Sequence, residues 1–464
     1  MDNERNVRDL EQMHVTAAQH PRLFEPGLLL LNLVLCVLGC IIGLELMANT
    51  GTTPNTSLVG ALIAIIISRI PIARFMKLRS IHRQNLIQTS ISGATFAVAN
   101  CMFLTVGVPI LMGRSDLMIP MLIGVTLATA IDATILYKCF DTPMFPAEGA
   151  WPPGVATAET LLAVVNKGRR ALLLLVGMGM GVVGKMIGLP MDLLGVSWFG
   201  NFAAMMGLGV GSLVIGSVKT NAFGFKLFGH SFVLVSDMFG AGYDTSHLAI
   251  TYLGHGLMIG AGMVSLIQAA RMLMQKDDGE SSAASRFTSS MKNMRNAMGL
   301  GYIAYAVVAL GIAIVSGLLY EMSIGMFVAW ILFAAVAALV SEIMVGIAAM
   351  HSGWFPGFAT AFVFLIIGML IGFPALPLGI LVAYTASTGP CFSDMGYDLK
   401  TGYILRGNGK DKELELFGRK QQWYAELLGF AVAFIMMAFF ANNYFGQEMF
   451  APVSKTYVST IAAG

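Results

Sequence analysis

The chain has 464 residues, of which 56% are hydrophobic and only 12% charged, and its mean hydropathy is +0.74. Soluble globular proteins carry about twice that charged fraction, so the composition excludes an ordinary soluble domain and predicts an integral membrane protein. The formal net charge of +2 gives no sign of a nucleic-acid-binding surface.

The chain contains many runs of apolar residues, and a run of about 20 crosses the hydrocarbon layer as a helix. We therefore predict an all-α polytopic bundle of about 12–14 transmembrane helices, some of them broken or re-entrant. The predicted spans lie near 27–48, 57–77, 86–112, 117–137, 170–189, 198–218, 222–242, 247–274, 298–320, 322–349, 358–373, 375–390 and 422–446. The segment 222–242 carries polar side chains and is a candidate re-entrant or pore-lining segment. Prolines at 374 and 377 leave open a second reading of 358–390, as one kinked helix.

The polar segments divide the chain. Residues 1–26 are mixed in charge and carry no cleavage site, which predicts a cytoplasmic tail before an uncleaved anchor. The longest polar stretch between spans, 275–297, predicts a cytoplasmic linker between an N-terminal transmembrane half, 27–274, and a C-terminal half, 298–464, as in transporters built from two repeats. Lys and Arg are concentrated in the connections at 74–83, 167–170, 271–295 and 400–420 and are missing from those at 49–56 and 190–197, which predicts that the N-terminus and the four basic connections lie in the cytoplasm. We expect the protein in the plasma (inner) membrane.

The sequence lacks the common short motifs of hydrolases, metalloenzymes and nucleotide-binding proteins. It has no His-Glu-x-x-His, Cys-x-x-Cys or Gly-x-Ser-x-Gly, and the P-loop-like run from Gly179 lacks the magnesium-binding Ser or Thr and lies in an apolar span. We expect no enzyme activity, no cofactor and no metal centre. An integral-membrane enzyme with paired carboxylates, Asp394 and Asp398, is the competing class, but a lysine lies beside them and no nucleophile is evident.

The segment 138–170 is rich in proline and glycine, which prevents a continuous helix until one begins near Val155 and carries Glu159. Irregular backbone near the bilayer persists where it is buried in protein or lines a watery cavity. Glu148 lies within the irregular stretch and is a candidate to meet a substrate ammonium or a proton. The alternative is an ordinary cytoplasmic loop.

Two further segments are candidates for the transport pathway. Gly389-Pro390 breaks a span, after which Asp394 and Asp398 share a face if the helix resumes, and Lys400 follows. Such groups bind a zwitterion or relay protons, or they mark a solvated helix end. Asn85 and Gln88 share a face at the start of the third predicted span, where amides contact substrate or join helices.

Isolated acids within predicted spans form a separate group. Asp132 and Glu342 are costly in lipid, so we expect both to face the bundle interior, and Arg69 is a candidate partner for one of them.

Several of these segments resemble conserved elements of the oligopeptide transporter family, and they occur in the family's order. The first matching elements are Asn85-Leu-Ile-Gln88-Thr89 (N-x-x-Q-T) and Phe145-Pro146-Ala-Glu148-Gly149-Ala, which is followed by an alanine-rich helix up to Glu159. The C-terminal elements are Asp398-Leu-Lys400-Thr-Gly (D-L-K-T-G) and Arg419-Lys-Gln-Gln422 (R-x-Q-Q). The glycine-rich run from Leu253 to Gly260 matches more loosely. The chain is shorter than typical members, with an extra Pro-Pro at 152–153 and an insertion at 409–417.

The resemblance implies a secondary active transporter that imports a small peptide or related amino-acid conjugate by proton-coupled symport and alternating access. The family's other branch implies uptake of metal chelates instead, which needs no metal ligands from the protein. Implied partners are the substrate, protons and the lipid bilayer. The oligomeric state is left open, with a homodimer among the options.

Overall fold

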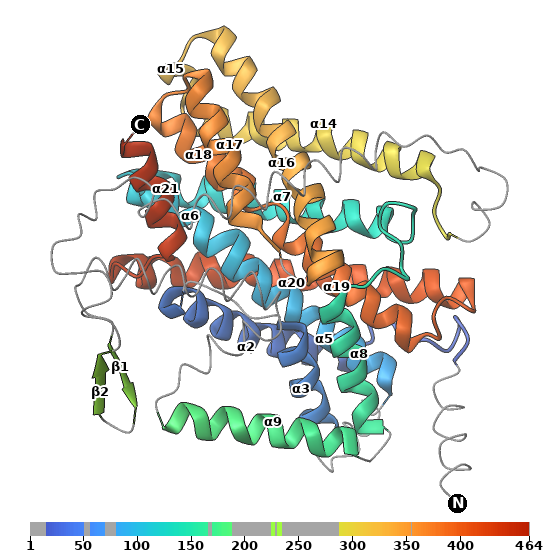
Figure 1. The fold of residues 1–464 in the computed structure, drawn as a ribbon. Helices are drawn as coiled ribbons and strands as arrows, with labels where there is room; N and C mark the ends of the chain where they lie inside the picture. Colours follow the sequence, from blue (N-terminus) through green and yellow to red (C-terminus); the bar gives the residue numbers. More distant parts are fainter. Residues whose placement is uncertain are drawn as a thin grey trace, which may run out of the picture.

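The computed structural model describes residues 15–50, 56–69, 80–165, 169–187, 224–227, 230–233, 287–353 and 355–463. This part of the chain is a helical bundle, and seven of its helical segments are long and apolar enough to cross a membrane. The predicted all-α polytopic fold is therefore confirmed (Figure 1). A small two-stranded hairpin is the exception among the described elements.

The elements follow one another along the chain with short connections where these are described. They are α2 (Pro26–Thr50), α3 (Thr56–Arg69), α5 (Ile81–Phe96), the π-helical η2 (Ala97–Phe103), α6 (Leu104–Leu111), η3 (Ser115–Leu117), α7 (Met118–Cys139), α8 (Pro152–Val165), α9 (Arg169–Met186), β1 (Gly224–Leu227), β2 (His230–Val233), α14 (Met291–Val315), α15 (Leu318–Glu321), α16 (Ile324–Ser352), α17 (Gly357–Ile371), α18 (Ala375–Ala386), α19 (Pro390–Leu405), α20 (Lys412–Gly446) and α21 (Pro452–Ala463).

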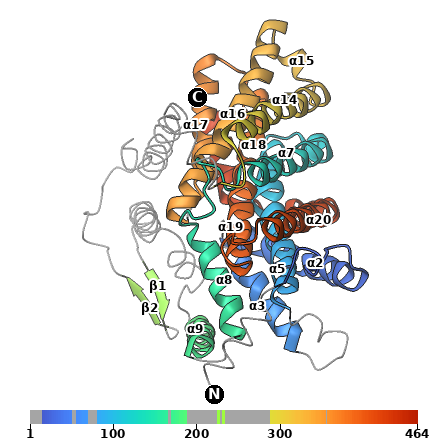
Figure 2. The same cartoon turned by 90° about the vertical axis from the view of Figure 1, so that its right-hand side faces the viewer.

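Four long helices form a row along one side of the bundle. Figure 2 shows α14, α7, α20 and α2 stacked in this order, and each packs against the next. Their outward faces expose apolar side chains such as Leu30, Leu127, Leu300 and Phe439, as expected of surfaces that meet lipid.

Two helices behind this row are buried almost along their whole length. These are α5 and α19, and α19 packs against α5, α7, α8, α16 and α20. Both carry many polar residues, which in a membrane protein must find their hydrogen-bond partners inside the bundle. The polar interior therefore centres on α19.

Both central helices are interrupted. The span that contains α5 continues through the π-helical η2 into α6. The α18–α19 span is broken at Gly389, which has φ of +99° and is followed by Pro390 at the start of α19. The predicted break at Gly389-Pro390 is thus confirmed, because glycine tolerates this backbone and proline fits the first turn of a helix.

The two spans predicted at 358–373 and 375–390 are separate helices that pack against each other, and the alternative of one kinked helix is wrong, because the chain turns at Gly372, with φ of +92°, before Pro374. The boundary of the predicted linker shifts. Helix α14 begins at Met291, inside the predicted linker, where the Ser290 side chain caps it by accepting from Asn293 N.

The predicted span at 222–242 is not helical where it is described. Strands β1 and β2 pair antiparallel there, with Gly224 opposite Val233, in a sequence whose glycines disfavour a helix and whose Phe and Val favour strands. The predicted spans 198–218 and 247–274, and the C-terminal part of 57–77, lie outside the described residues.

Candidate functional site

The start of α19 is fixed by an acid from another helix. Asp132 of α7 accepts hydrogen bonds from Gly389 N at 2.9 Å and from Phe392 N at 2.7 Å. A carboxylate at this position satisfies amides that the helix leaves unpaired and interacts favourably with the helix dipole. The expectation that Asp132 faces the interior is confirmed, and its contact shows that it caps the broken span.

Three buried acids meet beside the first two turns of α19. Asp394 and Asp398 lie one turn apart on one face of α19, as predicted, and Glu426 reaches them from α20. One carboxylate oxygen from each lies within 4.8 Å of the other two, and all three side chains are fully buried. We call Asp394, Asp398 and Glu426 the carboxylate triad.

Hydrogen-bond donors to the triad come from α3 and α5. Gln88 Nε2 donates to Asp398 Oδ1 at 2.5 Å, and Ser92 Oγ donates to Asp394 Oδ1 at 2.7 Å. Ser57 Oγ lies 2.9 Å from Asp398 Oδ1 and 3.4 Å from Asp394 Oδ1. Each aspartate therefore has one oxygen that is held by neutral donors.

The remaining triad oxygens lack a hydrogen bond of acceptable geometry within the described part of the chain. These are Asp394 Oδ2, Asp398 Oδ2 and both carboxylate oxygens of Glu426. No Lys, Arg or His among the described residues forms an ion pair with any of the three acids. At an effective dielectric constant of about 20, each pair of ionised groups within 4.8 Å repels by at least about 3.5 kcal/mol. The triad is therefore suited to hold protons or a cation.

Gln422 connects α19 to a second set of charges. Its Nε2 donates to Asp398 O at 2.6 Å and to Thr89 Oγ1 at 3.3 Å, and its Oε1 accepts from Arg406 Nη1 at 2.8 Å. The N-x-x-Q-T, D-L-K-T-G and R-x-Q-Q elements, far apart in the sequence, are thus joined directly by side-chain hydrogen bonds.

The charges beyond Gln422 are paired. Arg406 Nε lies 2.7 Å from Glu415 Oε2, Arg419 Nη2 lies 3.1 Å from Glu415 Oε1, and Arg419 Nη2 lies 3.9 Å from Asp141 Oδ2. Arg406, Glu415, Arg419 and Asp141, which we call the arginine cluster, are all buried. Its two cations and two anions compensate one another, in contrast to the triad.

The proline-glycine segment packs against the opposite face of α19. Lys400 Nζ donates to Ala147 O at 2.8 Å, and Thr401 Oγ1 donates to Gly154 O at 3.0 Å. Trp151 covers Gly396, where an added Cβ would collide with the indole ring. The Lys400 ammonium is therefore held by the loop and does not bond to Asp394 or Asp398.

The predicted site residues fall into two groups in the structure. Gln88, Asp394 and Asp398 come together, and Asn85 lies buried one turn before Gln88 on α5. Phe145, Pro146 and Gly149 shape the loop, where Pro146 O accepts from Gly149 N and from Trp151 Nε1. The acids Glu148 and Glu159 are exposed, on the loop and on α8.

Sequence reasoning missed Glu426, Ser57 and Ser92. Glu426 carried a usable signal, because it is an acid within an apolar predicted span, like Asp132 and Glu342. The two serines carried none, since serine is common at helix contacts in membranes and only the packing of α3 and α5 on α19 gives them a role.

Glu342 occupies a separate position in the interior. Its Oε2 accepts from Tyr305 OH at 2.5 Å, and Tyr384 OH donates to Tyr305 O at 2.9 Å. Glu342 is fully buried, as predicted. The side chain of Arg69, the candidate partner for either Asp132 or Glu342, lies outside the described residues.

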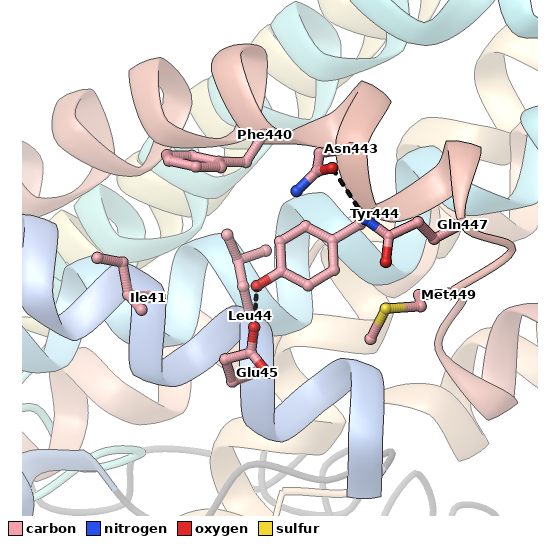
Figure 3. Close-up of a pocket in the computed structure, with 8 residues that line it drawn as sticks. All are labelled: Ile41, Leu44, Glu45, Phe440, Asn443, Tyr444, Gln447 and Met449. Atoms are coloured by element: carbon pink, nitrogen blue, oxygen red, sulfur yellow. Dashed lines mark hydrogen bonds between the residues drawn. The ribbon is translucent and has the colours of Figure 1, made fainter.

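A cavity of about 270 Å³ lies between the C-terminal ends of α2 and α20 (Figure 3). Tyr444 OH donates to Glu45 Oε1 at 2.6 Å on its wall. Sites for drug-sized ligands usually have volumes of about 300–1,000 Å³, and none of the triad residues lines this cavity. It is therefore not the best candidate for a peptide site.

Comparison with known proteins finds one family model that matches part of the chain. A model of the OPT oligopeptide transporter protein family matches residues 246–464, a range that contains the whole triad. No curated protein matches the chain. The N-terminal elements that donate to the triad lie outside the matched range but are hydrogen-bonded to it.

Proposed function

We propose, from the match of residues 246–464 to the OPT oligopeptide transporter protein family, that the protein is a member of this family and a proton-coupled importer of a small peptide or related amino-acid conjugate. The family supports an oligopeptide-type transporter in a membrane, with several spans and no enzymatic role. The observation that carries the finer proposal is the carboxylate triad, because three buried acids that have no basic partner among the described residues need protons or another cation.

The proton in this scheme binds among the four triad oxygens that have no hydrogen-bond partner in the described part of the chain. Protonation removes the repulsion between the acids and lets Glu426 approach the α19 pair, whereas deprotonation separates them. The triad joins α19 to α20, and its hydrogen-bond donors come from α3 and α5. A change in the charge of the triad therefore strengthens or weakens the contacts among these four helices. Such a change is a physical basis for alternating access.

The interruptions of the central helices support the same mechanism. Gly389 breaks the α18–α19 span just before the triad, and the π-helical η2 follows the donors Gln88 and Ser92 on the other span. Discontinuous helices often form substrate and ion sites in transporters. We propose that these two breaks are the hinges that move when the triad changes charge.

Substrate contacts in this scheme are divided among the predicted residues. Gln88 is bonded to Asp398 and so positions the acid, which leaves Asn85 as the nearer candidate for the substrate backbone. Glu148 is exposed on the proline-glycine loop and is the candidate for the substrate ammonium rather than for the coupling proton.

The test is uptake into proteoliposomes of labelled di- to tetrapeptides and of metal chelates, with and without an inward proton gradient. We expect peptide uptake that rises with the gradient in the wild type. Asp398→Asn should abolish the response to the gradient while exchange of labelled for unlabelled peptide persists, since exchange requires no net proton movement.

Glu148→Gln is the matched comparison, because it removes an exposed acid of the same region. It should keep the gradient response and weaken peptide binding. Uptake indifferent to the gradient in the wild type would overturn the proton coupling, and uptake of chelates without peptides would assign the protein to the metal-chelate branch.

A further inference from the structure

A long groove runs between α7 and α14 on the outer side of the bundle. Its volume is about 900 Å³, near the upper end of ordinary small-ligand sites. Its lining residues are Leu127, Ala130, Ile131, Thr134, Ile135, Lys138, Ser289, Asn293, Asn296, Ala297, Leu300, Gly301, Ala304, Val307 and Val308. None of them belongs to the triad or to the arginine cluster.

The groove is polar at one end and apolar along the rest. Lys138, Ser289, Asn293 and Asn296 lie at the end where α7 finishes and α14 begins. From there the walls are aliphatic as far as Leu127 on α7. Lys138 follows Leu127 by 11 residues, which corresponds to about 16 Å of helix at about 1.5 Å per residue. On α14 the lining extends from Asn293 to Val308, 15 residues or about 22 Å, so on both helices the groove is shorter than the hydrocarbon core of about 30 Å.

The polar end lies in a basic and aromatic neighbourhood. Lys138 is exposed, and Lys292 and Arg295 are exposed on the first two turns of α14. Tyr137 stacks on Trp423 with ring centroids 5.1 Å apart, and Trp423 Nε1 donates to Thr134 Oγ1, a lining residue. Lys, Arg, Trp and Tyr collect where transmembrane helices meet the lipid headgroups. The loop charges predict that this end faces the cytoplasm.

We propose that the groove binds one anionic glycerophospholipid, with its phosphate at Lys138, Asn293 and Asn296. One acyl chain then lies along Leu127, Leu300 and Val307. Two observations favour a lipid over a helix from a second copy. The groove is shorter than the hydrocarbon core on both helices, whereas a spanning helix would need a contact along the whole core. Among the described residues that line it, the single charged group is a cation, which matches a phosphate. Basic pockets between transmembrane helices are known to bind anionic headgroups in this way.

Native mass spectrometry of the full chain in detergent tests the site. The purified protein is titrated with dioleoyl phosphatidylglycerol or with dioleoyl phosphatidylcholine. We expect the first phosphatidylglycerol to bind more tightly than phosphatidylcholine. Lys138→Gln should weaken phosphatidylglycerol binding about fivefold, the factor for one basic group near an anionic surface, and Lys455→Gln, at an exposed lysine outside the groove, should not.

A second pair of variants tests the acyl part. Ala304→Leu fills the groove and should weaken both lipids, whereas Gly325→Leu adds bulk to α16, away from the groove, at an exposed glycine with nothing within 4 Å and should leave binding unchanged. Equal affinities for the two lipids, or equal effects of Lys138→Gln and Lys455→Gln, would overturn the proposal. Protein dimers that persist at saturating lipid and are lost in Ala304→Leu would assign the groove to a second copy and also overturn it.

Discussion

The carboxylate triad and the arginine cluster are both buried and both lie beside α19, yet they differ in charge balance. Glu415 is bonded to two arginines, while Glu426, on the same helix, has two aspartates as its charged neighbours among the described residues. In a compensated cluster each group keeps its charge, because loss of one partner would leave the other charge buried and unpaired in a medium of low dielectric constant. An uncompensated cluster changes its charge state more readily, which is what a coupling site requires.

The two clusters are also physically connected. Gln422 bonds to the backbone of Asp398 and to Arg406, so the arginine cluster holds one end of the helix that carries the triad. The contrast between them can be tested by making the same type of substitution in each.

The largest effect on stability is expected at the arginine cluster. Glu415→Gln removes the only acid that bonds to Arg406 and the closest partner of Arg419 in the described structure. Because the buried Arg406 guanidinium then loses its countercharge and Arg419 keeps only Asp141, at 3.9 Å, the free energy of unfolding should fall by about 3–5 kcal/mol. Urea or thermal unfolding in detergent measures it, and an unchanged stability would show that the cluster is not structural.

The matched change at the triad should affect transport instead. Glu426→Gln removes a charge from a group of like charges, so stability should be equal to or higher than that of the wild type. Gradient-driven uptake should fall about 100-fold, the lower limit for loss of a positioned proton-transfer group. A variant that unfolds like Glu415→Gln but still transports would reverse the assignment of the two clusters.

A pH effect is expected next to the arginine cluster. Burial above all, and then the charges of His82 and Arg406, lower the pKa of His20 to about 3. His20 Nδ1 donates to Pro21 O at 2.9 Å, and its ring lies 5.0 Å from that of His82. Between the unfolded pKa of 6.5 and the folded value, only the unfolded chain binds the proton, so stability is full above pH 6.5 and falls as the pH decreases.

This loss should amount to about 2 kcal/mol between pH 7 and pH 5. Unfolding measured across this range checks it, and His20→Gln should flatten the dependence. His351→Gln, at an exposed histidine at the end of α16, is the control and should keep the wild-type dependence. The same slope in all three proteins would contradict the assignment to His20.

The smallest expected effect concerns the packing around Glu426. A Cβ at Gly93 would lie 2.8 Å from Glu426 Cδ, so Gly93→Ala crowds the triad. Overpacking costs about 1–3 kcal/mol, and the gain in helix propensity offsets up to about 1 kcal/mol of it, which leaves a net loss of about 1 kcal/mol. Gly311→Ala, with nothing within 4 Å, should be stabilising instead. Equal stabilities of the two variants would show that the triad has spare room.

Much of the candidate site was predictable from local sequence. Asp394 and Asp398 are four residues apart after Gly389-Pro390, so a resumed helix puts them on one face. Asn85 and Gln88 were recognisable as polar groups in an apolar span. Lys400 was misleading, because its place two residues after Asp398 suggests a charge partner, whereas the helix turns it toward Ala147 on the opposite side.

The sequence by itself determined that this is a many-span helical membrane protein, because hydropathy and charge act locally and need no knowledge of packing. It also determined where the central span breaks and that the acids face inward, since glycine, proline and charge in lipid each restrict the backbone or the environment. Only the tertiary structure decided that Gln88 and Glu426 meet Asp398, because those contacts join residues from three helices. No local pattern specifies which helices lie side by side, and that choice is what separates a compensated charge cluster from an uncompensated one.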